Sequence, residues 1–353
     1  MGLSNEMGRR FARGVLYVAS IGLALHLMLP QIPGLRRSAE LMMEAAPVLI
    51  LLAFLAELLS ELCYADLLGR SVMMSSGLGP YLRYRRHRGI GLWFTLRLAV
   101  TGYGAAHVLP GGGATAATVT YAALRSRGFE RRKIALAVAA VSALVYGALG
   151  VIFAGSLLYM VLNRDLGVAQ TSVAFVGFVF VLVAGAGSYE AYRNPALTRR
   201  VLVRLLLLGG RLLRRKWSRR RIESWAATAV SNVRDEIKAA RRQYVSRARS
   251  TLGLAGLALG YWVFDALCLI VMFHALGVPA GAVELLVAYG VATAAGTLPF
   301  TPGGIGIFET TMITTLALLG VGSEAAIPVL GYRLFNFWLP IPLAAIFYPT
   351  LRF

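Results

Sequence analysis

The sequence predicts an all-α polytopic membrane protein with about six full spans and two oppositely oriented re-entrant helical hairpins, resembling an inverted repeat. Of its 353 residues, 58% are apolar and 15% are charged, against about 45–50% and about 25% in soluble domains. Apolar runs recur from end to end and reach the ~20 helical residues needed to cross a bilayer. Basic residues gather between these runs, so a single membrane domain is expected to fill residues 1–353.

The formal net charge of +20 is concentrated in one loop, 193–249, where seventeen Arg or Lys residues stand against three acids. The positive-inside rule places such a loop in the cytoplasm. Apolar residues among the charges predict amphipathic helices on the membrane surface, attracted by anionic lipid: Leu212, Leu213, Trp217, Ile222 and Trp225. A regulatory partner is the alternative, and we expect no nucleic acid.

The spans follow from the apolar runs and the charges that flank them. Arg9, Arg10 and Arg13 precede the first run, which lacks a small-x-small cleavage site and therefore predicts a retained helix. Basic clusters place both termini in the cytoplasm of a bacterial-type inner membrane, although Arg36 and Arg37 oppose this topology. The expected spans are 14–30, 44–67, 134–161, 171–192, 251–276 and 325–349.

The first expected hairpin, 90–124, lies in the first half of the chain, 14–192, between two basic clusters at 70–88 and 125–133. Since both clusters should be cytoplasmic, this stretch enters and leaves the membrane by the same face. Its centre reads "LPGGGA", where Pro110 removes a backbone donor and three glycines allow turn geometries closed to other residues: Gly111, Gly112 and Gly113.

The second expected hairpin, 283–322, lies in the second half, 250–353, and is entered from outside. Its centre, "TLPFTPGGIGIFE", contains Pro302, Gly303, Gly304 and Gly306. Breaks in corresponding places with opposite topology predict an inverted-repeat transporter with a substrate site between them. Helix N-termini at such breaks could bind an anionic head group. Alternatively, the breaks are glycine-rich turns between ordinary helices.

Ionisable residues inside spans are costly and usually face a cavity or a partner. Glu309 directly follows the second break, and Arg333 lies in the last helix. We expect the two to pair in an empty site and to separate when Arg333 meets a phosphate. Arg97 is the corresponding cation of the first hairpin, unless it extends toward the interface instead.

Glu57 and Glu61 lie one helical turn apart, which puts them on one face of a helix. They predict a proton or ion path or a partner for Arg97; otherwise they close buried structural pairs, and Asp265 is similar. His107, just before the first break, is a further candidate. The four histidines share no ligand spacing, and Cys63 and Cys268 lie in apolar runs, so neither a metal nor a cofactor is expected.

The chain contains no recognised catalytic motif, such as a zinc-protease histidine pair or a Gly-x-Ser-x-Gly turn. We therefore do not expect an enzyme. The alternative of a membrane-embedded lipid-modifying enzyme would use Glu309 with His107. A further alternative is a non-catalytic partner of a lipid or cell-envelope synthase, docking through 193–249.

The segments "TLPFTPGGIGIFE", "LPGGGATAATVTYAALRSRGF" and "GYRLFNFWLP" resemble the transmembrane region of lysylphosphatidylglycerol synthases, a flippase-like family. The similarity covers roughly residues 14–349. Bifunctional members add a soluble aminoacyl transferase domain; because the sequence stops at Phe353, we expect a stand-alone member without that domain. Many relatives carry an acid shortly after the first glycines, where this chain has "GGGATAAT", so the resemblance supplies no carboxylate there.

The resemblance implies a flippase-like transporter for an anionic phospholipid, a glycolipid or a polyprenyl-linked lipid. Its head group would enter a polar cavity between the two breaks while its tail stays in the bilayer.

The predicted topology can be tested with cysteines placed at positions 128 and 280. The first should react with an impermeant thiol reagent only from the cytoplasmic side and the second only from outside, because the charge pattern puts them on opposite faces. Labelling of both from one side would contradict the opposed orientation of the hairpins.

Overall fold

The computed structural model describes residues 38, 40–77, 90–109, 112–163, 167–212, 218–297 and 301–351. All regular secondary structure in these ranges is helical, as the composition predicts. Four helical segments among them are long and apolar enough to cross a membrane: Pro47–Ser75, Arg131–Leu162, Ala248–Ala275 and Ala326–Leu351. The protein is therefore a polytopic membrane protein.

These four segments coincide with four of the six predicted spans. A fifth prediction, 171–192, falls in α7 (Val168–Arg193), where Gln170–Val179 is a shorter apolar stretch. The predicted span 14–30 lies outside the described residues, as do Pro110 and Gly111 of the first break.

The chain divides into two compact units, Met1–Ala174 with Leu252–Phe353 and Phe175–Thr251. The second unit contains α8 (Pro195–Leu212) and α9 (Arg219–Val245), and it includes the predicted basic loop. α8 packs on α9 within that unit, where Ile222 is buried against α8. Ile222 is thus covered by protein, whereas Trp225 remains exposed; Leu213 and Trp217 lie outside the described residues.

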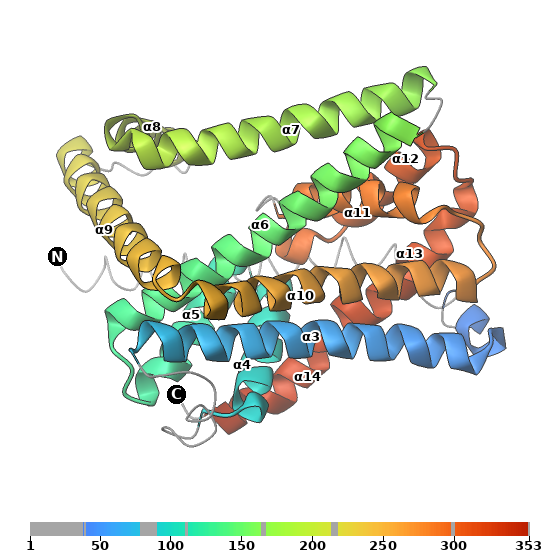
Figure 1. Ribbon diagram of the computed structural model, residues 1–353, viewed down its shortest axis with the longest axis horizontal. Coiled ribbons are helices and arrows are strands. Elements are labelled where there is room, and N and C mark those ends of the chain that lie inside the picture. Colours follow the sequence, from blue (N-terminus) through green and yellow to red (C-terminus); the bar gives the residue numbers. More distant parts are fainter. Residues whose placement is uncertain are drawn as a thin grey trace. The chain divides into compact units, whose positions relative to one another are not determined.

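Three long helices build much of the first unit: α3 (Pro47–Ser75), α6 (Arg131–Asn163) and α10 (Ala248–Ala275). α3 and α10 run alongside each other in Figure 1, and the Ser60 hydroxyl donates a hydrogen bond to the Tyr261 carbonyl at 2.8 Å. The indole N–H of Trp262 donates to the Val145 carbonyl on α6 at 2.6 Å. Side chain to backbone bonds thus join all three helices through α10.

Two pairs of short helices occupy the predicted hairpin segments: α4 (Leu92–Val108) with α5 (Gly113–Ser126), and α11 (Ala282–Gly296) with α12 (Ile307–Leu318). The members of each pair pack against each other. At a rise of 1.5 Å per residue they are about 18–26 Å long, shorter than the ~30 Å hydrocarbon core. A short 3₁₀ turn, η3 (Pro302–Gly304), lies within the second break.

The last predicted helix is divided by a distortion of its backbone. After the 3₁₀ turn η4 (Ser323–Ala325), α13 (Ala326–Arg333) continues into a π-helical turn, η5 (Leu334–Trp338), then α14 (Pro340–Phe347) and a final 3₁₀ turn, η6 (Tyr348–Leu351). The Leu339 N–H donates to the Leu334 carbonyl at 2.9 Å. This i to i−5 bond defines a π turn, which is frequent at functional sites.

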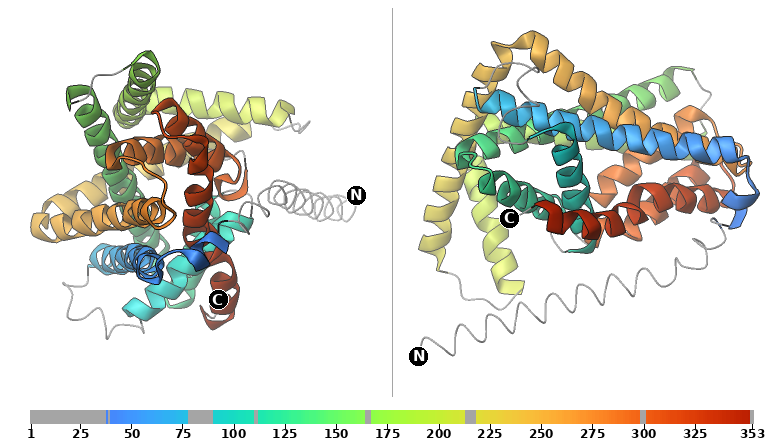
Figure 2. Two further views of the ribbon diagram at one scale, coloured as in Figure 1. Left: turned by 90° about the vertical axis from the view of Figure 1, so that its right-hand side faces the viewer. Right: turned by 90° about the horizontal axis from the view of Figure 1, so that it is seen from below.

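The last helices (red) lie next to α4 (cyan) in Figure 2. The contact depends on Gly104, because a Cβ at that position would lie 2.5 Å from the Ala344 Cβ and 2.8 Å from the Pro340 carbonyl oxygen. No larger side chain fits this approach without movement of α14. The glycine therefore fixes the distance between α4 and α14.

Gly104→Ala should destabilise the protein by about 1–3 kcal/mol, because its methyl group overpacks the contact with α14. Gly102→Ala is the matched control on the same helix, since its Cβ would lie 3.5 Å from the nearest atom. In both variants the alanine itself stabilises the helix relative to glycine by up to ~1 kcal/mol, so the difference between the two reports the overpacking at Gly104. Thermal unfolding in one detergent measures both, and equal melting temperatures would contradict the close approach.

Candidate functional site

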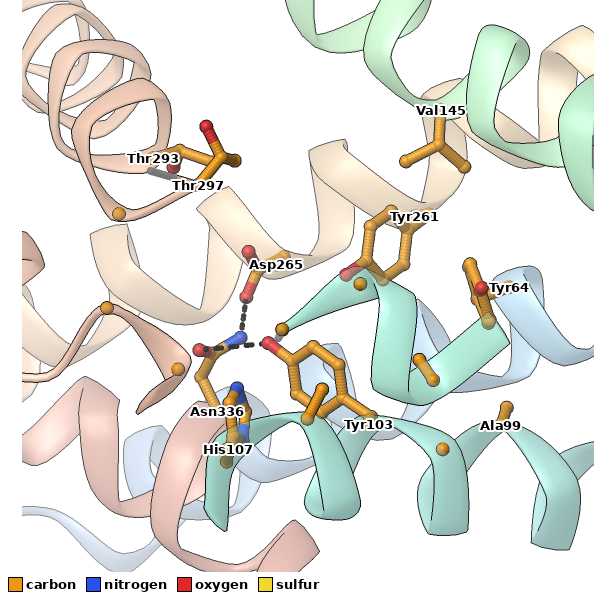
Figure 3. A pocket seen from close by; sticks show the side chains of 18 of the residues that line it. Tyr64, Ala99, Tyr103, His107, Val145, Tyr261, Asp265, Thr293, Thr297 and Asn336 are labelled. Atoms are coloured by element: carbon orange, nitrogen blue, oxygen red, sulfur yellow. Dashed lines mark hydrogen bonds between the residues drawn. The ribbon is translucent and has the colours of Figure 1, made fainter. Parts of the chain in front are cut away.

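A cavity of about 390 Å³ lies inside the first unit, within the size range of small-molecule sites. Its wall carries the carboxyl groups of Glu61 and Asp265, the amide of Asn336 and the guanidinium of Arg333, together with several tyrosine and threonine hydroxyls. Figure 3 shows Tyr103, His107 and Asn336 around the same space. The cavity thus brings several polar and ionisable side chains together in a wall that is otherwise largely apolar.

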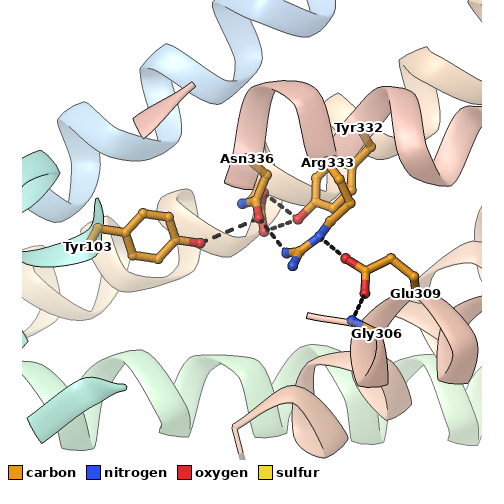
Figure 4. Close-up of polar contacts among 7 residues, drawn as sticks. Tyr103, Gly306, Glu309, Tyr332, Arg333 and Asn336 are labelled. Carbon is orange, nitrogen blue, oxygen red and sulfur yellow. Dashed lines mark hydrogen bonds and ion pairs between the residues drawn. The ribbon is translucent and has the colours of Figure 1, made fainter. Parts of the chain in front are cut away.

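Arg333 and Glu309 form a buried ion pair beside this cavity. The Arg333 Nε lies 2.6 Å from Glu309 Oε1, and the two side chains are 4% and 7% exposed. The other carboxylate oxygen, Oε2, accepts a hydrogen bond from the Gly306 N–H at 2.7 Å (Figure 4). Glu309 therefore caps α12 and neutralises Arg333 at the same time.

Asn336 connects the cationic and acidic parts of the site. Its Nδ2 donates to Asp265 Oδ1 at 2.9 Å and to Glu57 Oε1 at 3.4 Å. Its Oδ1 accepts from Arg333 Nη1 and from the Tyr103 hydroxyl, each at 3.4 Å (Figure 4). A single amide thus contacts groups from α3, α4, α10 and α13.

Asp265 is 2% exposed and accepts hydrogen bonds only from neutral groups among the described residues. The Tyr332 hydroxyl donates to Oδ1 at 2.9 Å, the Tyr289 hydroxyl donates to Oδ2, and Asn336 supplies the third donor. Two tyrosines from α11 and α13 therefore bind to one carboxyl group on α10.

Glu57 and Glu61 bring two further carboxyl groups from α3, as their spacing predicts. Glu61 lines the cavity, and Glu57 reaches Asn336 behind it. Both are more than nine-tenths buried. Arg97 is not their partner in the described structure: its guanidinium carbon lies 5.7 Å from the Trp93 ring centroid, and Arg97 is not among the described residues that line the cavity.

Five buried polar atoms at the site have no hydrogen-bond partner within the described residues: Glu57 Oε2, His107 Nδ1, Thr293 Oγ1, Thr301 Oγ1 and Arg333 Nη2. Arg333 and His107 both line the cavity. An unsatisfied polar atom in a protein interior costs about 1–3 kcal/mol. The site therefore has unused capacity to bind a polar ligand.

The second break reaches the end of α4 through Gly303. Its φ of +58° is in the left-handed region, and a Cβ there would lie 2.6 Å from His107 Cδ2 and 2.6 Å from Phe337 Cε2. The His107 ring also stacks on Phe337 with centroids 4.3 Å apart. Only glycine combines this backbone conformation with this close contact.

Most of the residues predicted for substrate binding surround or support the cavity. Pro302, Gly303, Gly304, Gly112, Gly113 and Arg333 line it, and Gly306 and Glu309 lie behind Arg333. The sequence reasoning did not single out Asn336, Tyr103, Tyr289 or Tyr332. Asn336 follows Arg333 by three residues, so its helical spacing could have indicated a shared face. No group of three possible metal ligands occurs in the described ranges.

Comparisons with known proteins point to one family. A family model described as "Lysylphosphatidylglycerol synthase TM region" matches residues 15–344. A "UPF0104 membrane protein" from Methanothermobacter thermautotrophicus is 35% identical over 68 residues, which are 19% of this chain and 19% of that relative. The chain thus matches about a fifth of that relative's length, whereas the family match covers nearly the whole chain.

Removal of either partner of the buried ion pair should destabilise the protein more than removal of both. Glu309→Gln or Arg333→Gln leaves an unpaired buried charge and should cost about 3–5 kcal/mol, and the double variant should recover part of this loss. Arg219→Gln is the control, since it breaks the exposed Arg219–Glu223 pair, worth at most about 1 kcal/mol.

Thermal unfolding of the parental protein and the four variants in one detergent measures these differences. Strictly additive effects of the two single substitutions would show that Glu309 and Arg333 do not interact.

Proposed function

Because the chain belongs to the lysylphosphatidylglycerol synthase TM region family, we propose that it moves a lipid between the two leaflets of the membrane. The lipid is an anionic phospholipid, a glycolipid or a polyprenyl-linked lipid. One observation carries the proposal: the buried guanidinium of Arg333 lies in the wall of the cavity and keeps Nη2 without a partner among the described residues.

Glu309 occupies the position that a phosphate would take. Its two oxygens bind the Arg333 Nε and the Gly306 N–H. A phosphate group offers oxygen acceptors of the same kind, and the planar guanidinium suits them. In the proposed cycle the head group replaces Glu309 on Arg333, while Glu309 stays on the N-terminus of α12.

The remaining wall of the cavity supports recognition of a polar head group. Thr293, Thr297 and the Tyr261 side chain face the same space as Asp265 (Figure 3). Hydroxyl and carboxyl groups can exchange hydrogen bonds with glycerol or sugar hydroxyls, so the head group can leave water while the acyl or prenyl tail stays in lipid. Rocking of the two halves would then expose the cavity to the other leaflet.

The two short helix pairs are, in this proposal, re-entrant hairpins that enter from opposite faces. Their arms are shorter than the hydrocarbon thickness, and their breaks lie against the cavity through Gly112, Gly113 and Gly303. Backbone that is irregular at membrane depth is tolerated where it is buried or lines a polar cavity. The arrangement therefore fits a substrate site near the membrane centre.

The basic unit with α8 and α9 would lie at the cytoplasmic surface and bind anionic lipid through its Arg and Lys side chains. It also offers a surface to which a lipid-synthesis enzyme could bind. The proposed function involves no nucleic acid and no covalent change of the lipid. Both termini would be cytoplasmic. If the protein were instead a non-catalytic partner of a synthase, deletion of 193–249 would abolish its function and variants of the cavity would stay active. Comparing the deletion with the cavity variants therefore distinguishes a transporter from a scaffold.

Arg333→Gln should slow lipid translocation about 10- to 100-fold, the effect of losing a charge-assisted hydrogen bond of about 1.5–3 kcal/mol. The assay uses liposomes with fluorescent phosphatidylglycerol, in which a membrane-impermeant reductant bleaches only the outer leaflet. Arg132→Gln, which removes an exposed arginine at the start of α6, should translocate at the parental rate.

A folded Arg333→Gln protein with parental activity would exclude Arg333 as the head-group ligand. Chemical conversion of the lipid by the purified protein would favour the enzyme alternative instead.

A further inference from the structure

Acidic groups outnumber cations at the site. Four carboxyl groups, Glu57, Glu61, Asp265 and Glu309, accompany the single guanidinium of Arg333 in the described part of the site, and each of the five residues is at most 8% exposed. Of these four carboxyl groups, only Glu309 forms an ion pair with a described residue. Unpaired carboxylates inside a membrane protein are expensive unless a proton or a cation neutralises them.

The hydrogen bonds of the cluster Glu57, Glu61 and Asp265 do not supply that neutralisation. Asp265 accepts from two tyrosines and Asn336, all neutral donors. Within the described residues Glu57 accepts from Asn336 at 3.4 Å and interacts directly with the Asp265 carboxyl group. No other described group donates to its Oε2, although the side chain is only 5% exposed. A carboxyl group with a free buried oxygen has room for a proton.

An anionic head group would increase this imbalance. In the proposed function it takes Arg333 from Glu309, which adds one negative charge to the buried site and leaves Glu309 without its cation. Asn336 touches Arg333 on one side and Glu57 and Asp265 on the other. The occupancy of Arg333 is therefore coupled electrostatically to the carboxyl cluster at short range.

We propose that the carboxyl cluster Glu57, Glu61 and Asp265 is a proton-binding site that takes up one proton when an anionic head group binds Arg333. This inference rests on the proposed function and supplies its energy source: lipid and proton cross together. The step forms one O–H bond, as a cluster carboxylate and an aqueous proton become a carboxylic acid. Release of the head group to the other leaflet restores the Glu309–Arg333 pair and returns the proton to water there.

Several other titratable groups face the cluster or the cavity beside it. They are six tyrosines, one cysteine, one histidine and the two members of the ion pair: Tyr64, Tyr103, Tyr146, Tyr261, Tyr289, Tyr332, Cys268, His107, Glu309 and Arg333. Of these, His107 and Glu309, once Glu309 is separated from Arg333, could also accept a proton near neutral pH, and the cluster variants below distinguish both from the cluster.

The test measures proton uptake directly. The full-length protein in phosphatidylcholine nanodiscs is titrated with dihexanoyl-phosphatidylglycerol, and empty nanodiscs provide the blank. Calorimetry in two buffers of different ionisation enthalpy gives the number of protons bound per lipid. We expect about one, and a Kd that rises about tenfold per pH unit while that proton is exchanged.

Glu57→Gln and Asp265→Asn should each reduce proton uptake by at least half while phosphatidylglycerol still binds. Loss of proton uptake in His107→Gln, with uptake kept in Glu57→Gln and Asp265→Asn, would place the proton on the imidazole and overturn the cluster. Asp66→Asn is the matched control, since Asp66 lies on α3 but is paired with Arg70 at 2.5 Å outside the cavity, and it should keep the parental uptake.

Each outcome has a distinct meaning. Phosphatidylglycerol binding without proton uptake overturns the proton site and leaves the proposed function standing. Binding of dihexanoyl-phosphatidylcholine as tight as that of phosphatidylglycerol, without proton uptake, overturns it too, because the quaternary ammonium would then neutralise the carboxylates in place of a proton. Absence of phosphatidylglycerol binding overturns the proton site and also the anionic phospholipid as the substrate in the proposed function.

A second measurement uses only the parental protein, so it does not depend on whether a variant folds. Infrared spectra of the parental protein at neutral pH should contain a protonated carboxylic C=O band that shifts in heavy water and grows when phosphatidylglycerol is added. A spectrum with no such band before or after addition overturns the proton site.

Discussion

A charge buried within a membrane has to find its partner inside the protein, and this constraint organises the centre of the molecule. Arg333 would be prohibitively costly alone in lipid. Its partner Glu309 comes from another helix and is itself held by the Gly306 N–H. The pair thus ties α13 to the N-terminus of α12, so the break in the second hairpin and the charge on the last helix form one structural feature.

The backbone irregularities serve the same site. The left-handed conformation at Gly303 brings the second break against His107, while the π turn follows Arg333 directly and contains Asn336 and Phe337. Regular helices would satisfy every backbone group but would leave less room for a polar cavity between them. The chain therefore concentrates its irregular backbone where polar side chains line a common space.

Prediction from sequence succeeded where a single segment carried the signal. Long apolar runs indicated the spans, and the described residues of the two motifs, Gly112 and Pro302–Gly304, lie between the members of the short helix pairs. Glu309 and Arg333 were both visible as charges in apolar surroundings. Asn336 and the tyrosines were not, because neutral polar residues are common in membrane helices and nothing in their local sequence separates a hydrogen-bonding hub from an ordinary wall residue. Arg97 shows the opposite case, as a conspicuous charge that lies over Trp93 away from the cavity.

The sequence by itself determined that the protein lies in a membrane, that it is helical, and where the chain departs from regular helix. These properties follow from composition and from the local conformations open to glycine and proline. The tertiary structure alone decided which charges meet, since Glu57, Asp265 and Asn336 come from three helices separated by up to 279 residues. Hydrogen bonds act over a few ångströms, so their partners depend on how helices pack and not on distance along the chain.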